Sequence, residues 1–587
     1  MKPLAIGVDN FKKMIDGDYY FVDKSLFIKD ILDHKGEVNL FTRPRRFGKT
    51  LALSMIRYFF EKEECVSADS LSNQQLFDGL KIMKTGDKYL NHKGKYPVIS
   101  LSLKSAKQPD FKMAHASLID EIAKEYERHC YILQSADITD SNKARFQAVM
   151  YKKAEAIDYA KALDFLSRLL EAYHHEKVII LIDEYDVPLE NAYFNSFYKE
   201  MISFIQSLFE SALKTNSSLA FAVITGCLRI SRESIFTGLN NLNILSILDE
   251  KYAEYFGFTQ KEVEEMFSFY GIEERIKEAG SWYDGYMFGQ TAIYNPWSII
   301  NFVDTALNNR TAFPKPYWAN TSSNQIVKKL VEKADIQAKQ EIEALIAGGT
   351  IEKPVHEDIT YEDIYRTQDN LWNFLYFTGY LKKVSEHLEG VTHYISLGIP
   401  NLEVRYIYEN TIQGWFREQI RQGDLTGMYQ AMFAGDAESF QAELAGLLRT
   451  TISYMDSKEA FYHGFILGTL CNLTEYLVES NHEGGDGRYD ILVRNLDVTI
   501  PPIIMELKIS RTFKGMEQDC RKALEQIEDK KFERRSLSNI ELMSAEADRG
   551  CKYDSWLPEE GYQETIRYGI AFFKKQCRIA VEKKNFY

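Results

Sequence analysis

The chain has 587 residues and a mass of 68.0 kDa, several times the usual domain of about 150 residues, so a single small binding module is excluded. Hydrophobic residues make up 45%, charged residues 27% and aromatic residues 13%, a composition that excludes a disordered or fibrous chain. The 71 Lys and Arg residues against 85 Asp and Glu residues give a net charge of −14, which excludes a uniformly basic coat but not a local basic groove.

The seven cysteines are widely spaced and form no C-x-x-C pair, so neither a disulfide framework nor a structural zinc site is expected. The N-terminal run MKPLAIGVDNF is too short for the apolar region of a signal peptide. No stretch approaches the ~20 apolar residues that cross a bilayer. We therefore expect a cytoplasmic protein with no membrane partner.

The first segment with a functional signature is a strand, loop and helix. Residues 38–42 (VNLFT) predict a strand, residues 43–50 (RPRRFGKT) a basic turn, and the following LALSMIRYFF a helix, which is the order that a phosphate-binding loop requires. The turn departs from G-x-x-x-x-G-K-[ST] only at Arg43, which stands at the first glycine. Pro44 also lacks an N–H for a phosphate.

This loop supplies most of the expected contacts to ATP. Gly48 lets the backbone approach the phosphates, Lys49 is expected to reach the β- and γ-phosphates, and Thr50 is expected to place its hydroxyl on Mg²⁺. The predicted cofactor-binding set is Arg45, Arg46, Phe47, Gly48, Lys49, Thr50, Asp183 and Thr225, with Thr50 and Asp183 as metal ligands.

Further apolar segments predict three more strands, at residues 97–103, 178–182 and 219–225, with helical stretches between them. A long helical insertion is expected over residues 111–170. Continuous apolar strands that alternate with helices are typical of a parallel sheet covered on both faces. We therefore predict the parallel sheet of a P-loop NTPase.

Two adjacent acids follow the apolar strand VIILI. We expect Asp183 to hold the Mg²⁺ shell and Glu184 to polarise the attacking water as a catalytic residue. The alternative is that both acids begin a solvated turn. Thr225 ends the next strand and is a candidate contact for the γ-phosphate, and Arg229 and Arg232 are candidate charge sensors. A strand-end cap and surface arginines are the alternative roles.

Four segments together resemble a known family: YFVDKSLFI, FTRPRRFGKT, VIILIDEYDVPL and ITGCLRISRESIFTGLNNL. They are similar to the AAA-ATPase-like family of bacterial proteins, which typically carry a C-terminal PD-(D/E)XK nuclease-superfamily domain. The resemblance spans about residues 5–290 and resumes near residue 459. In that family an arginine at the position of Arg43 is usual. Residues 20–24 (YFVDK) are a weak candidate for an adenine-side box.

The middle of the chain has mostly helical periodicity. Residues 259–398 predict a helical lid or connector, in which the aromatic groups WYDGY and YW are candidates for stacking on bases or for core packing. A second helical stretch runs over residues 403–453, where Asp436 is expected to cap a helix.

The C-terminal α/β segment contains candidate residues for metal-dependent phosphodiester cleavage. Asp490 ends GDGRYD, and Glu506 and Lys508 lie two residues apart in the predicted strand PIIMELKI, so their side chains share a face. Two carboxylates that bind a divalent ion, with a lysine beside the water, form a constellation for phosphodiester hydrolysis. Hard oxygen ligands favour Mg²⁺ or Mn²⁺ over zinc. Asp490 and Glu506 are the predicted metal ligands.

The order of elements around this trio resembles the PD-(D/E)XK core. By that resemblance Asp490, Glu506 and Lys508 are the catalytic trio, and Glu459 and Gln526 are supporting candidates. The alternative is a solvated hairpin edge or a nuclease fold without activity. His463 and His482 are expected to pack or to lie on the surface.

The sequence thus predicts an α/β protein in three parts: an AAA-ATPase-like domain at 1–255, a helical lid or connector at 256–400, and a helical lead-in with a restriction-endonuclease-like α/β domain at 401–587. We expect an ATP-hydrolysing protein whose nucleotide state controls a metal-dependent nuclease. The alternatives are an ATP-dependent switch with an inactive, nuclease-like docking domain, and a nuclease whose ATPase domain is kept only as a scaffold. The expected partners are ATP, nucleic acid (DNA ahead of RNA) and either a second copy or another protein. Cations expected near the trio are Lys508, Arg511, Lys514, Arg521, Lys522, Lys530 and Lys531.

Overall fold

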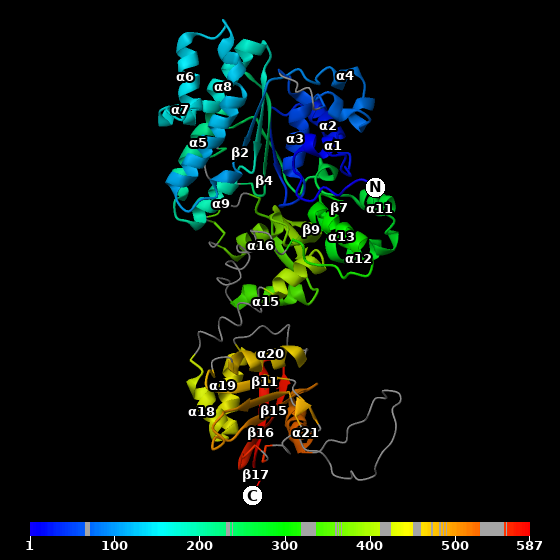
Figure 1. Ribbon diagram of the computed structural model, residues 1–587, viewed down its shortest axis with the longest axis vertical. Coiled ribbons are helices and arrows are strands. Elements are labelled where there is room, and N and C mark those ends of the chain that lie inside the picture. Colours follow the sequence, from blue (N-terminus) through cyan, green and yellow to red (C-terminus); the bar gives the residue numbers. More distant parts are fainter. Residues whose placement is uncertain are drawn as a thin grey trace. The chain divides into compact units, whose positions relative to one another are not determined.

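The structure is a computed structural model, and its chain folds into two compact units (Figure 1). The first unit comprises Met1–Val327 and Gly348–Ile407, and the second comprises Lys328–Ala347 and Tyr408–Tyr587. The structure describes residues 1–64, 71–229, 235–236, 239–318, 336–357, 361, 363–364, 367–410, 424–449, 459–470, 473–480, 483–484, 487–488, 490–528, 557–558 and 560–586.

The centre of the first unit is a five-stranded parallel sheet with the order β2-β3-β4-β1-β5. Its strands are β1 (Val38–Thr42), β2 (Val98–Ser102), β3 (Val178–Asp183), β4 (Leu219–Gly226) and β5 (Leu242–Leu245). The predicted parallel sheet is therefore confirmed. Strand β4 lies between β1 and β3, so the carboxyl ends of these three strands are neighbours at one edge of the sheet.

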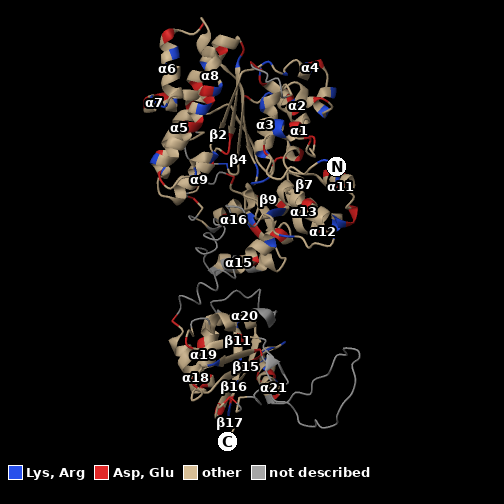
Figure 2. Cartoon of the chain, in the orientation of Figure 1, with Lys and Arg blue, Asp and Glu red and all other residues tan. Residues whose placement is uncertain are grey.

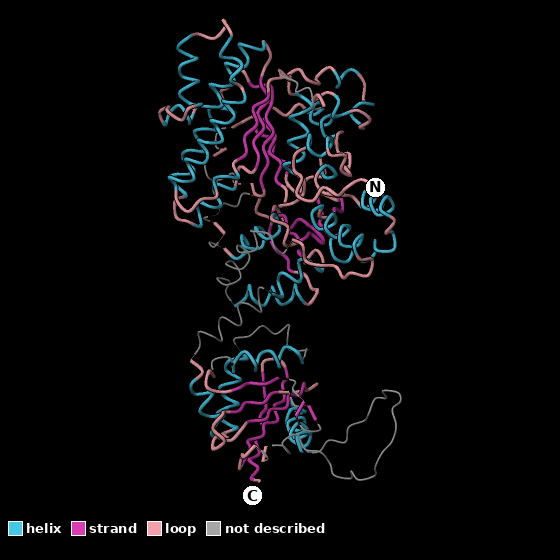
Figure 3. Tube along the Cα trace, in the orientation of Figure 1, coloured by secondary structure: helices cyan, strands magenta, loops and turns pink. Residues whose placement is uncertain are grey.

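Helices cover both faces of this sheet (Figure 3). On one face lie α5 (Phe111–Arg128), α6 (Asp140–Met150), α7 (Ala156–Ala160) and α8 (Ala162–His174), which form the predicted insertion between β2 and β3, and on the other lie α1 (Phe11–Asp16), α2 (Leu26–His34) and α3 (Lys49–Phe60). Every residue of β1 and β3 is buried. Charged residues lie mainly on the flanking helices (Figure 2), as expected for a sheet buried on both faces.

The rest of the first unit is mixed rather than mostly helical. It contains α11 (Gln260–Tyr270), α12 (Ile276–Tyr283), α13 (Pro296–Asn308) and α16 (Gln368–Phe377), as expected from the helical periodicity, but also the hairpin of β6 (Tyr286–Phe288) and β7 (Thr291–Ile293). A three-stranded antiparallel sheet has the order β8 (Ile351–Pro354), β10 (Thr392–Gly398), β9 (Lys382–Glu389). Most of β9 is exposed, so its sequence lacks the apolar alternation that predicts a strand.

The second unit has a five-stranded sheet with the order β11-β14-β15-β16-β17. These strands are β11 (Leu477–Ser480), β14 (Ile491–Arg494), β15 (Ile503–Ile509), β16 (Glu564–Phe573) and β17 (Gln576–Asn585), and only β15 and β16 pair in parallel. A short pair, β12 (Glu483–Gly484) and β13 (Gly487–Arg488), precedes β14. The predicted C-terminal α/β domain is confirmed.

The two faces of this second sheet pack against different helices. Residues of α18 (Thr426–Ala434), α19 (Ala437–Arg449) and α20 (Glu459–Leu470) share one core with Ile503, Met505 and Leu507 of β15. Ile504 instead packs with Ile527 of α21 (Met516–Glu528) on the other face. As predicted, Asp436 caps α19, because its Oδ1 accepts hydrogen bonds from the backbone N–H groups of the first turn. The second unit also contains the helix α15 (Ile336–Ile346).

Candidate functional sites

The predicted phosphate loop joins β1 to α3, and two left-handed residues shape it. Arg46 has φ of 70° and Gly48 has φ of 83°. Gly48 is the N-cap of α3, so Lys49 and Thr50 form the first turn of that helix. The free backbone N–H groups of a helix N-terminus and the helix dipole favour an anion at this position. The local backbone is therefore suited to a phosphate group.

Arg43, which replaces the first glycine of the motif, is fully buried. Its guanidinium donates to the carbonyl oxygens of Leu245, at 2.8 Å, and Thr42, at 2.9 Å. The same group lies 5.3 and 5.2 Å from the ring centres of Phe256 and Phe288. Burial lowers the pKa of Arg43 to about 10, which still leaves it charged at neutral pH. Arg43 thus ties the start of the loop to the end of β5.

The ammonium of Lys49 lies inside the loop. Its Nζ donates to the carbonyl oxygens of Arg43 at 2.8 Å and Pro44 at 2.9 Å, and it lies 3.6 Å from Cys227 Sγ at the end of β4. Burial raises the pKa of the Cys227 thiol to about 11, so this neighbour is neutral. A phosphate oxygen accepts a stronger, charge-assisted hydrogen bond than a backbone carbonyl does. The Lys49 ammonium therefore binds a phosphate more strongly than it binds its present carbonyl partners.

Asp183, the last residue of β3, is hydrogen-bonded both to the first turn of α3 and to β4. Its Oδ2 accepts a hydrogen bond of 2.7 Å from the Thr50 hydroxyl, and its Oδ1 accepts one of 2.5 Å from the Thr225 hydroxyl. The three residues meet because β4 lies between β1 and β3 in the sheet. A hydroxyl and a carboxylate in contact provide the hard oxygen ligands that Mg²⁺ prefers, so these residues fit that ion.

Glu184, the predicted catalytic residue, has a left-handed backbone with φ of 53°. Burial and then the charge of Asp183 raise the pKa of its carboxyl group. Both effects favour a carboxylate that accepts a proton more readily than an exposed glutamate does. An unusual backbone conformation and a raised pKa are common at functional sites.

Asp186 belongs to no predicted motif position, but it fixes the turn that follows β4. Its Oδ2 accepts hydrogen bonds from the backbone N–H groups of Cys227, at 2.7 Å, and Leu228, at 3.1 Å. Burial raises the pKa of Asp186. Gly226 allows the close approach, because a Cβ at this position would lie 2.4 Å from the Tyr185 ring. Asp186 therefore holds Cys227 where it contacts Lys49.

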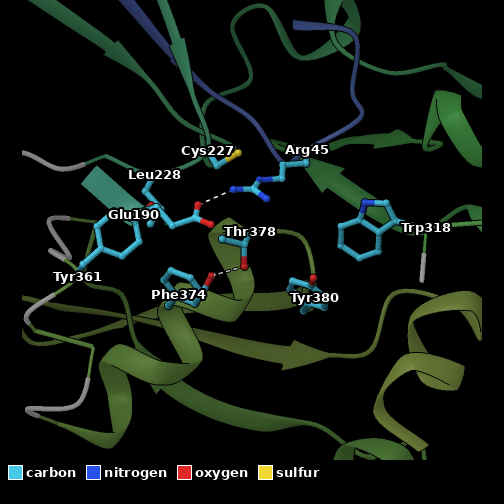
Figure 4. Close-up of a pocket in the computed structure, with 9 residues that line it drawn as sticks. All are labelled: Arg45, Glu190, Cys227, Leu228, Trp318, Tyr361, Phe374, Thr378 and Tyr380. Atoms are coloured by element: carbon cyan, nitrogen blue, oxygen red, sulfur yellow. Dashed lines mark hydrogen bonds and ion pairs between the residues drawn. The ribbon is translucent and has the colours of Figure 1, made fainter. Parts of the chain in front are cut away.

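Arg45 forms an ion pair with Glu190 of α9 (Val187–Phe194), as Figure 4 shows. Burial opposes the charge of Arg45, but Glu190 outweighs this effect and raises the pKa of the guanidinium. The pair lies at a narrow pocket. Its other lining residues are Cys227, Leu228, Trp318, Tyr361, Phe374, Thr378 and Tyr380. Arg45 thus ties the phosphate loop to α9.

The side chains of Arg46 and Phe47 lie against the segment that contains β6 and α13. The exposed Arg46 guanidinium is 4.3 Å from the ring centre of Trp297. Phe47 is fully buried, with ring centres 5.0 Å from Tyr286 and 5.3 Å from Phe288. Phe47 can therefore contribute to a nucleotide site through its backbone only.

The weaker candidates of the first unit have structural partners. Arg229 forms an ion pair of 3.2 Å with Glu357, and Arg232 lies outside the described residues. Lys24, in the weak adenine-side candidate, pairs with Glu262 at 2.6 Å. Tyr283 and Trp318 are buried, as expected for core packing.

In the second unit, Asp490 lies immediately before β14, beside the middle of β15. Its Oδ2 accepts a hydrogen bond of 2.8 Å from the backbone N–H of Leu507. Glu506 and Lys508 flank Leu507, and Lys508 Nζ lies 3.1 Å from Glu506 Oε1. Glu506 is only 3% exposed, whereas the Lys508 side chain is 29% exposed. The three predicted catalytic residues are therefore brought together.

Strand alternation places Glu506 and Lys508 on the face that α21 covers, because Leu507 packs on the opposite face. Gly569 of β16 stands beside Glu506 in the register, and a Cβ there would lie 2.3 Å from the backbone oxygen of Cys520 in α21. A glycine is therefore needed for α21 to lie close to the sheet next to the acid.

Asp519 of α21 is a neighbour of the trio that the sequence analysis did not find. Its Oδ2 accepts a hydrogen bond of 2.8 Å from the hydroxyl of Ser510, which follows β15. This hydrogen bond and the ammonium of Lys522 hold the pKa of Asp519 below its usual value, and the charge of Lys508 adds to the effect. Nothing in the local sequence links α21 to Lys508, so only the fold reveals that Asp519 lies close enough to be affected by the charge of Lys508.

The two histidines, expected to pack or to lie on the surface, and the supporting candidates Gln526 and Glu459 have different outcomes. His463 lies near the backbone of Asp490, with Nε2 3.0 Å from the carbonyl oxygen and 3.2 Å from Ser480 Oγ. Gln526 is half-buried in α21. Glu459 begins α20, but its side chain lies outside the described part of the chain, as does His482.

Two carboxylates, Asp490 and Glu506, are available to a divalent ion at this second site. Within the described residues no group of three or more His, Cys, Asp or Glu side chains is arranged to hold a metal. Mg²⁺ commonly binds through one or two carboxylates and keeps several waters, so the pair fits this ion better than it fits zinc.

No helix among the described residues is long and apolar enough to cross a membrane.

Two family models match the two regions that carry these sites. Residues 5–236 match the family model described as a predicted AAA-ATPase, and residues 457–541 match that of the PD-(D/E)XK nuclease superfamily. An uncharacterized protein in the vnfD 5' region of Azotobacter chroococcum mcd 1 is 29% identical over 331 residues, which are 55% of this chain and 54% of the relative. The chain therefore spans about half the length of this curated relative. A solved Walker-type ATPase of Pyrococcus abyssi is 12% identical with a TM-score of 0.34, over 70% of this chain and 99% of that chain.

Proposed function

Because the chain combines a predicted AAA-ATPase domain with a PD-(D/E)XK nuclease superfamily domain, we propose that it hydrolyses ATP and uses its nucleotide state to control a metal-dependent nuclease. The observation that carries this proposal is the presence of two separate constellations. Thr50, Asp183 and Thr225 are in contact in the first unit, and Asp490, Glu506 and Lys508 converge in the second.

In the ATPase half, the N-terminus of α3 and Lys49 bind the phosphates. Thr50 and Asp183 hold Mg²⁺, which when bound supplies positive charge at the β- and γ-phosphates. Glu184 lies beside Asp183 with a raised pKa, which suits it to orient a water and accept its proton. Lys49 exchanges its carbonyl partners in the loop for phosphate oxygens as ATP binds.

In the nuclease half, Asp490 and Glu506 hold Mg²⁺ or Mn²⁺, which when bound lowers the pKa of a water and offsets charge on the phosphate. Lys508 orients that water or stabilises the charge that develops on the phosphate. The water oxygen forms a bond to phosphorus and loses a proton to solvent as the P–O bond to the leaving oxygen breaks, and the leaving oxygen takes up a proton from solvent. DNA is the proposed substrate ahead of RNA, and the cytoplasm is the proposed location.

Paired activity measurements test this proposal. Lys49→Ala is expected to abolish phosphate release from ATP with Mg²⁺, and Lys508→Ala to abolish metal-dependent cleavage while ATP turnover remains. Lys583→Ala is the matched control, because it removes the same charge from an exposed position on the opposite face of the second sheet. Absence of ATP turnover in the wild type would refute the proposed ATP hydrolysis. ATP turnover without cleavage of any nucleic acid would favour a switch with a nuclease-like docking domain.

A further inference from the structure

An exposed basic and aromatic surface lies where β15 and β16 end. The two strands run in parallel, so their carboxyl ends, at Ile509 and Phe573, lie at the same edge of the sheet. The segments that follow them contribute five residues, which we call the basic-aromatic edge: Arg511, Phe513, Lys514, Lys574 and Arg578. All five are exposed.

One exposed aromatic ring and four cations make up this edge. Phe513 is 49% exposed, and the Arg578 guanidinium lies 5.9 Å from its ring centre. Lys574 Nζ lies 5.5 Å from the ring centre of Phe573, which is itself partly buried. A half-exposed Phe513 ring with a cation beside it offers a stacking surface next to positive charge.

The strand register connects this edge to the predicted catalytic trio. Lys508 is the parallel partner of Ala571, and Ala571 is the antiparallel partner of Arg578. These three residues form one row across β15, β16 and β17 and share a face of the sheet. Strands are about 4.8 Å apart, so the Cα atoms of Lys508 and Arg578 are separated by only about 10 Å.

Two acids of α21, the helix that packs on this face of the sheet, already have cationic partners. Glu517 pairs with Arg521 at 2.9 Å, and Asp519 pairs with Lys522 at 3.0 Å. Within the described residues, no ion pair involves the four cations of the basic-aromatic edge. Their charge is therefore available to an anionic partner, even though the chain as a whole has a net charge of −14.

We propose that the basic-aromatic edge binds single-stranded nucleic acid and guides it to the catalytic trio. Exposed aromatic rings stack on unpaired bases without the unstacking cost that a duplex imposes, and flanking cations follow the phosphate backbone. A duplex keeps its bases stacked inside and would use the cations alone. The proposal rests on the nuclease function proposed above and adds the class of substrate.

Binding measured in EDTA, which prevents metal-dependent cleavage, tests this proposal on the full-length protein. The probes are fluorescein-labelled dT and U strands of about 20 nucleotides and a duplex of the same length. The variants are Phe513→Ala, Phe513→Trp and Arg578→Ala. The matched controls are Leu496→Ala, which removes a side chain that is 95% exposed, and Lys583→Ala, which lies roughly 17 Å from Arg578 along the same strand.

We expect single strands to bind at least about tenfold more tightly than the duplex. Phe513→Ala should weaken single-strand binding about tenfold, Phe513→Trp should retain it, and both controls should match the wild type. Arg578→Ala should weaken binding and reduce its salt dependence. Equal binding of duplex and single strands, no binding of either, or an equal effect of Phe513→Ala and Leu496→Ala would overturn the proposal.

Restoring Mg²⁺ separates this inference from the nuclease function. Binding through Phe513 without cleavage would refute the nuclease function and leave the inference standing. Cleavage that is unchanged in Phe513→Ala and Arg578→Ala would support the nuclease function and refute the inference.

Discussion

The carboxylate of Asp490 accepts a hydrogen bond of 2.8 Å from the backbone N–H of Leu507, the residue between Glu506 and Lys508. This bond fixes the acid against the middle of β15 and thereby sets its place relative to the two charged side chains. One carboxylate thus has two roles: it satisfies a backbone donor, and it supplies oxygen to the proposed metal ion.

These two roles can be separated by two substitutions of Asp490. Asp490→Asn keeps an acceptor for Leu507 but loses the charge, so we expect a normal unfolding transition and a loss of metal-dependent cleavage of about 100-fold or more. Asp490→Ala should also lower the free energy of unfolding by about 1–3 kcal/mol, because the Leu507 N–H loses its partner. Urea unfolding and cleavage assays check both. Equal stabilities of the two variants would contradict this assignment.

The contact between Thr50 and Asp183 predicts a dependence on the hydroxyl group. Thr50→Val keeps the shape of the side chain but removes the hydroxyl, so ATP turnover should fall about 100-fold or more and no longer respond to Mg²⁺ concentration. Thr50→Ser should retain most of the activity, because its hydroxyl can still meet Asp183. Phosphate release measured against Mg²⁺ concentration distinguishes the two. Activity of Thr50→Val that matches the wild type would exclude the role given to Thr50.

The ion pair of Arg45 and Glu190 is mostly buried, with side-chain exposures of 22% and 12%. Glu190→Gln leaves the Arg45 charge without its counterion, so we expect the free energy of unfolding to fall by about 3 kcal/mol. The pair of Arg168 and Asp164 is the matched control because the Arg168 side chain is 54% exposed, and Arg168→Ala should cost less than about 1 kcal/mol. Similar losses in the two variants, measured by urea unfolding, would argue against a stabilising role for the buried pair.

Glu403 predicts a pH dependence of stability in the first unit. Burial raises its pKa from 4.5 to about 7, although the carboxylate accepts hydrogen bonds from the Trp318 N–H and the Ser298 hydroxyl. The folded protein therefore holds this proton more tightly than the unfolded chain does. The resulting stabilisation is present below pH 4.5 and is lost as the pH rises to about 7, by about 3 kcal/mol in all.

Glu403→Gln isolates this contribution, because glutamine does not titrate. The melting temperature of the wild type is expected to fall further between pH 5 and pH 8 than that of the variant. Scanning calorimetry at several pH values measures this difference. Parallel curves for the two proteins would show that Glu403 does not change its protonation on unfolding in this range.

Two strands of the parallel sheet in the first unit were predictable because every residue in them is buried. The segments VNLFT and VIILI are continuous apolar runs, and such runs form the buried strands β1 and β3. The shared face of Glu506 and Lys508 followed from strand alternation alone. The exposed strand β9 was missed, because its residues lack the burial that produces a readable pattern.

Long-range contacts account for what the sequence did not reveal. The partner of Arg45 is 145 residues away, and the carbonyl that binds Arg43 is 202 residues away. Asp186 binds backbone N–H groups, which carry no sequence signature at all. Only the order of the strands in the sheet brings these groups together.

The central claim is that a nucleotide site controls a nuclease site in one chain. Its most direct test is the rate of cleavage of a mixed DNA and RNA panel with Mg²⁺, measured with and without ATP, in the wild type and in Lys49→Ala. We predict cleavage by the wild type that changes with ATP, and cleavage by Lys49→Ala that does not respond to ATP. Cleavage by the wild type at the same rate with and without ATP would contradict the claim.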